Sequence, residues 1–177
     1  YSPDGQRIVA GSENSIITVW NLADGDRLRT YKGHTGPVNS ICYSADGSRI
    51  VTGSHDGTAK IWDALADQHN RILQRPEELI SGVSFSGQGP LLAIGAHNGM
   101  VDLRDVLKDK PVAHIKGHDS FVTSVAFQRN GRTIASGSFD STARIWDADT
   151  GQQVTVLEGH SDEINSVAYS QGGYRII

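Results

Sequence analysis

One spacing dominates this sequence: three series of residues recur every 42 positions along the chain, with no insertion between them. The series are Trp20, Trp62, Arg104 and Trp146; His34, Pro76, His118 and His160; and Asn14, Asp56, Asn98 and Asp140. A period of this length is the signature of a repeat architecture, in which each repeat forms one supersecondary unit. The chain must therefore fold as a series of similar units.

Each period carries the pattern of short β-strands. In residues 38–44, Ile41 and Tyr43 lie two positions apart, as in a strand with one buried face. Asp46-Gly47 and Asp56-Gly57 then provide the residues that tight turns need. We expect strands at 38–44, 49–54, 58–63 and 70–74, and no stretch shows a helical apolar stripe. Four short strands per period predict an all-β propeller blade.

The closing Trp-Asp and opening Gly-His pairs give these repeats a family resemblance. The pattern reads Gly33-His34 to Ile61-Trp62-Asp63, and again Gly117-His118 to Ile145-Trp146-Asp147. These residues resemble the WD-repeat (beta-transducin-like) family of β-propellers, and the resemblance covers the whole chain. It implies four blades' worth of four-stranded antiparallel sheets. The third is degenerate, because Arg75-Pro76 and Arg104-Asp105 replace the two signature pairs.

In this frame the chain is a single propeller region over residues 1–177. Repeat one spans 1–32 and lacks its innermost strand; repeats two, three and four span 33–74, 75–116 and 117–158, and a partial repeat spans 159–177. We expect a fragment of a larger ring first, because family members usually carry about seven blades. The second expectation is a head-to-tail ring of two copies. In this homo-oligomer the partial repeat of one copy, residues 159–177, would complete repeat one of the other. Closure by four blades alone is the least favoured, because it requires a strained quarter turn per blade.

The family resemblance implies a structural tetrad, in which a His, a Ser or Thr, an Asp and a Trp are joined by hydrogen bonds. Repeats two and four hold complete sets: His34, Thr52, Asp56 and Trp62, and His118, Ser136, Asp140 and Trp146. A nucleophilic triad is the alternative interpretation of the same residue types. Repetition of the set argues against catalysis, so we expect loss of Asp56 or Asp140 to destabilise the fold rather than abolish a reaction.

The other repeats depart from this set. Repeat one holds Asn14 and Trp20 without a histidine, a partial tetrad that His160 of one copy would complete in the other if two copies form a ring. Repeat three holds Pro76, Ile94, Asn98 and Arg104, a combination that cannot form the network.

Composition removes several function classes. A net charge of −4 and an isoelectric point near 5.9 give no electrostatic reason to expect nucleic acid or an anionic membrane. No stretch is long and apolar enough for a membrane span, and neither metal-ligand spacing nor a phosphate loop occurs. The one cysteine, Cys42, favours a reducing compartment, so we expect an intracellular, cytoplasmic protein without cofactor or metal.

Function is then expected in the turns and loops that differ between repeats. The resemblance places the partner-binding face at the loops before the innermost strands and at the turns between second and third strands. The candidates are Glu13, His55, His97, Phe139, Asp119, Phe121, Asp162 and Glu163. Phe139 is the preferred anchor, because an aromatic side chain in a tight turn suits an interface; packing on neighbouring loops is the equal alternative.

The sequence favours a non-catalytic scaffold that binds other proteins or peptides, with no enzymatic activity. A regulatory or sensor part of a larger signalling protein is a variant of this hypothesis. A lectin-like propeller that binds a small ligand or glycan is the alternative, and it would need exposed Trp or Tyr residues in loops. The three tryptophans instead fall on predicted strands.

Overall fold

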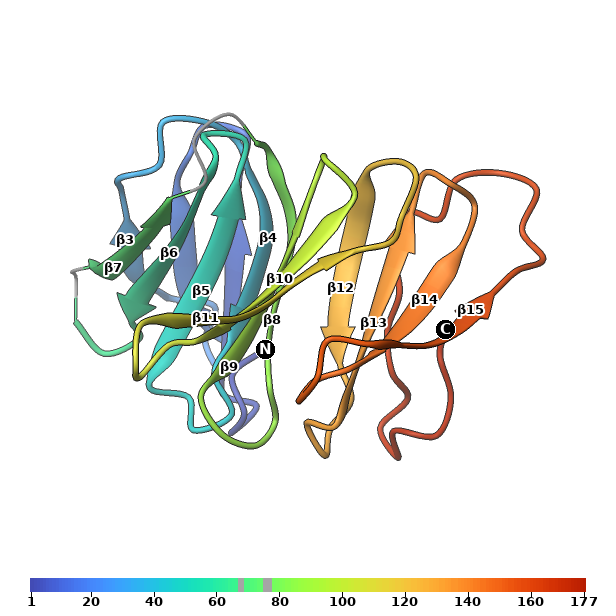
Figure 1. The fold of residues 1–177 in the computed structure, drawn as a ribbon. Helices are drawn as coiled ribbons and strands as arrows, with labels where there is room; N and C mark the ends of the chain where they lie inside the picture. Colours follow the sequence, from blue (N-terminus) through green and yellow to red (C-terminus); the bar gives the residue numbers. More distant parts are fainter. Residues whose placement is uncertain (67–68, 75–77) are drawn as a thin grey trace. The chain divides into compact units, whose positions relative to one another are not determined.

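The computed structural model describes residues 1–66, 69–74 and 78–177, and all regular structure in these ranges is β (Figure 1). The strands of the first two sheets are β1 Arg7–Gly11, β2 Ile17–Asn21, β3 Arg27–Tyr31, β4 Val38–Tyr43, β5 Arg49–Ser54, β6 Thr58–Asp63 and β7 His69–Gln74. The remaining strands are β8 Ile80–Phe85, β9 Leu91–Ala96, β10 Met100–Asp105, β11 Lys110–Lys116, β12 Val122–Phe127, β13 Thr133–Ser138, β14 Ala143–Asp147 and β15 Gln153–Leu157.

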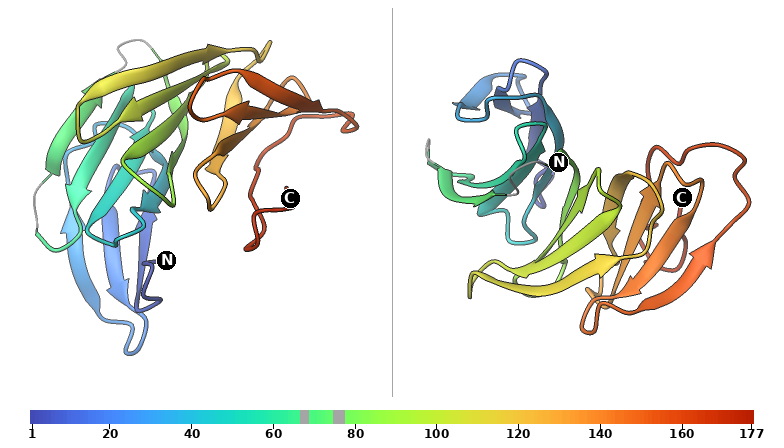
Figure 2. Two further views of the ribbon diagram at one scale, coloured as in Figure 1. Left: turned by 60° about the horizontal axis from the view of Figure 1, so that its bottom comes forward. Right: turned by 45° about the horizontal axis from the view of Figure 1, so that its top comes forward.

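Strands that are consecutive in sequence pair side by side, which gives four twisted antiparallel meanders (Figure 2). The first sheet holds β1, β2 and β3, and each later sheet holds four strands: β4 to β7, β8 to β11 and β12 to β15. The predicted all-β blades are confirmed, and the sheet of repeat one holds three strands. Repeat three forms its four-stranded sheet without the signature pairs.

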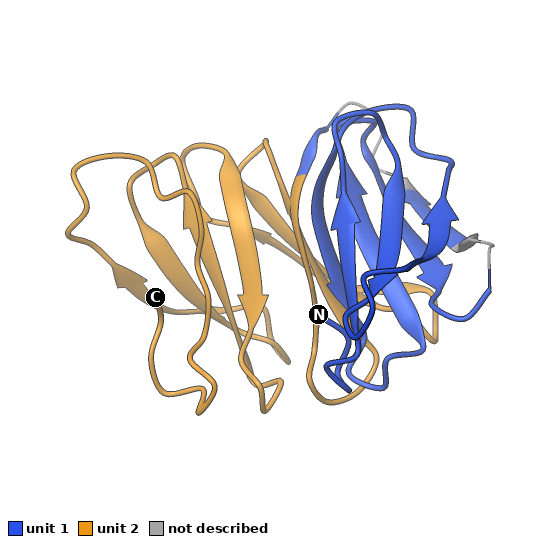
Figure 3. Cartoon of the chain, turned by 180° about the vertical axis from the view of Figure 1, so that it is seen from behind, with its two compact units in different colours: residues 1–80 blue, residues 81–177 orange. Residues whose placement is uncertain are grey.

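The described structure divides into two compact units, residues 1–80 and 81–177 (Figure 3). Compact unit 1 contains the sheets of repeats one and two. Compact unit 2 contains the sheets of repeats three and four, apart from the first residue of β8. No helix in the described part of the chain has the length and apolar character that a membrane crossing requires. The single propeller region over 1–177 remains a prediction.

Each compact unit buries its apolar side chains between two neighbouring sheets. In compact unit 1, Ile17 and Val19 of β2 pack in one cluster with Ile50 and Trp62 of the next sheet. In compact unit 2, Val101 and Leu103 of β10 pack in one cluster with Ile134 of β13 and its neighbours. Residues two apart on a strand face the same side, so the alternation in the sequence produces these layers.

A β-bulge occurs at the same place in all four sheets, where the third strand of the repeat pairs with the outer strand. The register shifts between Val19 and Trp20, between Ile61 and Trp62, between Leu103 and Arg104, and between Ile145 and Trp146. Bulges increase the local twist of a strand and re-aim a side chain. The recurrence at the Trp position therefore makes the bulge part of the repeat.

Turns between the first two strands of a repeat follow the predicted chemistry. In repeat two, the Ser48 N–H donates to Asp46 Oδ1 at 3.0 Å, and the Gly47 N–H donates to the Ser44 carbonyl at 2.9 Å. Gly47 has a φ of 70°, which glycine adopts without a steric cost. The hydrogen bond from the Ser44 hydroxyl, with the others that Asp46 accepts, lowers the pKa of Asp46 to about 2.

Buried polar networks and the candidate partner-binding face

The four tetrad residues of repeat two converge in a buried hydrogen-bonded chain. His34 Nδ1 lies 2.8 Å from Asp56 Oδ2, and His34 Nε2 lies 2.7 Å from the Thr52 hydroxyl. The Trp62 indole N–H donates to the same hydroxyl at 2.8 Å. Asp56 also accepts the Thr35 N–H at 2.9 Å. The network thus ties the loop before β4 to the β5–β6 hairpin and to the centre of the sheet.

Repeat four reproduces this geometry. His118 Nδ1 lies 2.8 Å from Asp140 Oδ2, and His118 Nε2 lies 2.7 Å from the Ser136 hydroxyl. The Trp146 indole N–H donates to that hydroxyl at 2.7 Å. Asp140 also accepts the Asp119 N–H at 3.1 Å. Two copies of one arrangement, built from Thr in one case and Ser in the other, indicate a role common to both repeats.

The hydrogen-bond pattern assigns the proton of each histidine. Asp140 is ionised at neutral pH and can only accept, so His118 carries its proton on Nδ1 and donates it to Asp140. Nε2 of the neutral imidazole then accepts the proton of the Ser136 hydroxyl, which itself accepts the Trp146 indole N–H. The same reasoning applies to His34. Thr52 and Ser136 are completely buried. A buried hydroxyl that accepts a hydrogen bond from an indole N–H is not accessible to a substrate. The hydrogen bonds of this hydroxyl instead join neighbouring strands and stabilise the sheet.

Burial and hydrogen bonding shift the pKa values of these groups in opposite ways. Desolvation is the largest effect on His34 and His118 and lowers the pKa of both imidazoles, although the neighbouring aspartates oppose it. Desolvation raises the pKa of Asp56, but hydrogen bonds from Thr58, Thr35 and His34 outweigh it and bring that pKa to about 2. The pKa of Asp140 is lowered for the same reason.

We expect the free energy of unfolding to fall steadily as the pH is lowered from neutral. Below about pH 6.5 the unfolded chain takes up protons on His34 and His118 that the folded chain does not. Between about pH 4 and pH 2 the same holds for Asp56. Urea unfolding at a series of pH values measures this slope. A stability that stays level or rises between pH 7 and pH 4 would contradict the assignment.

Repeat one makes different contacts at the equivalent positions. Asn14 Oδ1 accepts hydrogen bonds from the Ser12 hydroxyl and the Ile16 N–H, within its own turn. Trp20 is half-buried, whereas Trp62 is 1% exposed. His160, which we predicted to complete this set in a second copy of the chain, lies exposed in compact unit 2. Completion of the partial tetrad by His160 remains a prediction.

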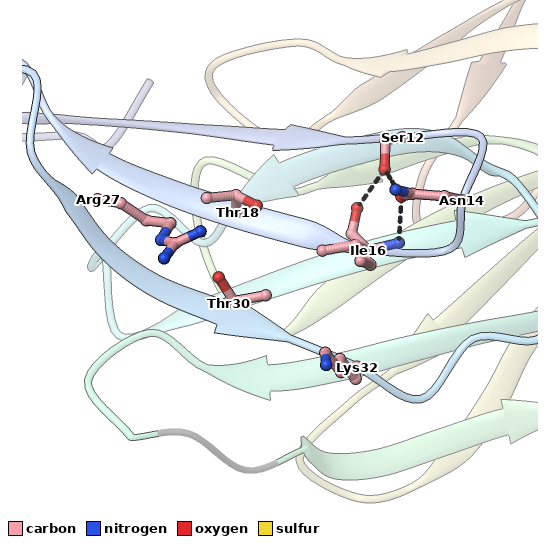
Figure 4. A pocket seen from close by; sticks show the side chains of 7 residues that line it. All are labelled: Ser12, Asn14, Ile16, Thr18, Arg27, Thr30 and Lys32. Atoms are coloured by element: carbon pink, nitrogen blue, oxygen red, sulfur yellow. Dashed lines mark hydrogen bonds between the residues drawn. The ribbon is translucent and has the colours of Figure 1, made fainter.

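A hollow of about 510 Å³ lies over the sheet of repeat one. Positions 14, 16 and 18 line it, and the equivalent positions of repeat two, Asp56, Thr58 and Lys60, contact the Gly33-His34 loop. The hollow therefore occupies the face that the histidine loop covers in repeat two. Figure 4 shows its lining residues Ser12, Asn14, Ile16, Thr18, Arg27, Thr30 and Lys32.

Repeat three has other contacts at the tetrad positions that the structure describes. Ile94 is 2% exposed and belongs to the core. Asn98 Oδ1 accepts the Met100 N–H at 3.0 Å, within its own turn. Arg104 lies 3.6 Å from Asp109 in an ion pair. The fourth position, Pro76, lies outside the described residues.

Three side chains from different loops of compact unit 2 form a contiguous aromatic surface, which we call the aromatic ladder: His97, Phe121 and Phe139. His97 stacks on Phe121 with ring centroids 4.7 Å apart and planes 11° apart. Phe121 contacts Phe139 with centroids 5.8 Å apart. The Phe139 N–H donates to the Phe121 carbonyl at 3.0 Å, which fixes the two loops together. Phe121 remains 44% exposed and Phe139 38% exposed.

The other candidate face residues are exposed but distributed over several loops. Glu13 and His55 lie in the β1–β2 and β5–β6 turns of compact unit 1. Asp119 lies two residues before Phe121, and Asp162 and Glu163 precede Ile164 in compact unit 2. The ladder is therefore a part of the predicted face where the structure brings candidates into direct contact.

Sequence reasoning missed several polar contributors to the networks. The Thr58 hydroxyl donates to Asp56 Oδ1 at 2.6 Å, and Thr142 makes the same contact with Asp140. Lys60 Nζ donates to the Gly33 carbonyl across the sheet. The signal was present, since Thr occupies this position only in the two repeats with a complete tetrad. Among the described residues, no cluster of three or more His, Cys, Asp or Glu could hold a metal ion.

Comparison with known proteins agrees with this geometry. The family model described as "WD domain, G-beta repeat" matches residues 1–21, 25–63, 109–147 and 151–177, and passes over most of repeat three. A segment of 43 residues is 42% identical to a periodic tryptophan protein 2 homolog from Dictyostelium discoideum. That match covers 24% of this chain and only 5% of the relative's length. Because the family model matches most of the length of this chain, the chain belongs to the WD40 repeat family.

Proposed function

We propose that this chain is a non-catalytic scaffold that binds another protein through the loop face of compact unit 2. WD40 repeats generally mediate protein–protein interaction, and the aromatic ladder is the observation that carries the proposal here. Aromatic side chains are enriched among the residues that dominate binding energy in interfaces. Two exposed phenylalanines held in contact by a backbone hydrogen bond form a rigid apolar patch ready for a partner.

The repeated polar residues support a scaffold rather than an enzyme. Thr52 and Ser136, the hydroxyls that a nucleophilic mechanism would use, are completely buried and hydrogen-bonded to a tryptophan. A lectin-like role has less support, because Trp62 and Trp146 are buried within the same networks. We further propose an intracellular location, on the basis of the single cysteine, and leave the regulatory part of a larger signalling protein as a variant.

Replacing Phe121 or Phe139 with alanine should weaken partner binding at least tenfold without unfolding the chain, since both rings are substantially exposed. A random dodecapeptide library displayed on phage and selected against the immobilised protein supplies the ligands. Binding of the enriched peptides is then measured by fluorescence polarisation. Leu107→Ala is the matched control, because Leu107 is 65% exposed in another turn of the same compact unit.

Failure of the selection to enrich any peptide would contradict the proposal. Peptides that bind both phenylalanine variants as tightly as the unchanged protein would contradict it as well, because the ladder would then not be the contact surface. Circular dichroism of each variant establishes that the loss of binding is not a loss of fold.

A further inference from the structure

The aromatic ladder is flanked by exposed carboxylates. On one side, Asp119 lies in the loop that carries Phe121 and is itself exposed. Its backbone is held in place, because the Asp119 N–H donates to Asp140 Oδ2 at 3.1 Å. A carboxylate on a fixed backbone two residues from an exposed ring provides a defined negative edge to the ladder.

A second exposed carboxylate, Glu163, precedes Ile164, whose N–H pairs with the residue before Phe139. The Ile164 N–H donates to the Ser138 carbonyl at 3.0 Å, so the residues preceding Ile164 and following Ser138 are brought together. In the repeat, Phe139 and Glu163 stand where His97 and Phe121 stand one period earlier. By sequence, a ring and a carboxylate occupy the positions that hold the stacked His97 and Phe121 one repeat earlier, and the exposed Asp162 adds a further charge.

No positive side chain balances these carboxylates within the loops concerned. The guanidinium of Arg144 lies 3.8 Å from Asp140 and donates to Gln153 Oε1 at 2.9 Å. Asp140 in turn is committed to His118. The loop segments without any Lys or Arg are 97–99, 119–121, 139–141 and 161–163. The face thus has an aromatic centre and a negative border.

We propose that the ladder selects a partner segment that carries arginine or lysine next to an apolar residue. The proposal rests on the scaffold function above and specifies its partner. The apolar residue covers the exposed phenylalanine rings, and the cation lies over an aromatic face and pairs with Asp119 or Glu163. A nucleic acid or an acidic peptide would be repelled by the same border.

The test uses the dodecapeptides enriched on the full chain in the selection described above. Arginine and lysine should be over-represented in them relative to the starting library, and affinity should fall at high salt, because exposed ion pairs are screened. The double variant Asp119→Asn, Glu163→Gln should weaken binding by about five- to tenfold, since each exposed pair contributes modestly. The matched control Asp149→Asn removes an exposed carboxylate from the β14–β15 turn and should leave binding unchanged.

The outcomes separate the two proposals. Enriched peptides that depend on Phe121 and Phe139 but lack basic residues, or that bind the double variant unchanged, would overturn the basic-segment proposal and leave the scaffold function standing. A consensus peptide that is acidic or neutral would likewise overturn the basic-segment proposal and leave the scaffold function standing. If no peptide depends on the ladder, both proposals fail together.

Discussion

Replacing Ser136 with alanine should lower the free energy of unfolding by about 3 kcal/mol. Its hydroxyl is completely buried and serves two partners, the Trp146 indole N–H and His118 Nε2, each at 2.7 Å. Alanine removes the hydroxyl and leaves both partner atoms buried without a hydrogen bond. Each such orphan costs about 1–3 kcal/mol, because water solvates these groups in the unfolded chain.

The chain itself provides the controls for this measurement. Threonine occupies the equivalent position in repeat two, where Thr52 makes the same contacts, so Ser136→Thr should cost less than about 1 kcal/mol. Ser161→Ala removes an exposed hydroxyl and should have almost no effect. Urea unfolding followed by circular dichroism gives the three values. An alanine variant within about 1 kcal/mol of the unchanged chain would show that the hydroxyl does not join the network.

The tetrads were expected because the family resemblance implies them, and the constant repeat makes their contacts recur. His34, Thr52 and Asp56 stand at constant offsets from Trp62, and strand pairing converts constant offsets into constant distances. Apolar alternation and turn chemistry likewise predicted the strands and the sheets. Repeat three shows that strand alternation alone is sufficient for a blade, since its sheet forms without a tetrad.

Features that depend on contact between successive repeats could not be read from one repeat alone. His97, Phe121 and Phe139 were candidates for separate reasons, and their stacking follows from a loop of repeat four lying against a turn of repeat three. The bulge could not be predicted from the residue types, because a tryptophan follows it in repeat one, Trp20, and an arginine follows it in repeat three, Arg104. Placing each loop against the preceding turn would have found the ladder.

Gly99 is another residue whose importance comes from such a contact. Position 99 adopts a φ of 78°, and Ser141 adopts 66° at the equivalent turn position of the next repeat, so the turn itself tolerates a side chain. At Gly99, however, a Cβ atom would lie 2.6 Å from the His118 carbonyl oxygen and 2.9 Å from that of Ser120. Those carbonyls belong to the loop that carries both the tetrad histidine and Phe121. Backbone atoms cannot yield as a flexible side chain can.

We therefore expect Gly99→Ala to lower the free energy of unfolding by about 3 kcal/mol, combining left-handed strain with overpacking. Gly89→Ala is the matched control: its φ is 81° and no atom lies within 4 Å of the added Cβ, so only strain of about 1 kcal/mol applies. Urea unfolding gives both values. Equal losses would mean that the 118–120 loop accommodates the methyl group. A larger loss at Gly99, with weaker binding of ladder-dependent peptides, would show that this close approach positions the loop carrying His118 and Phe121.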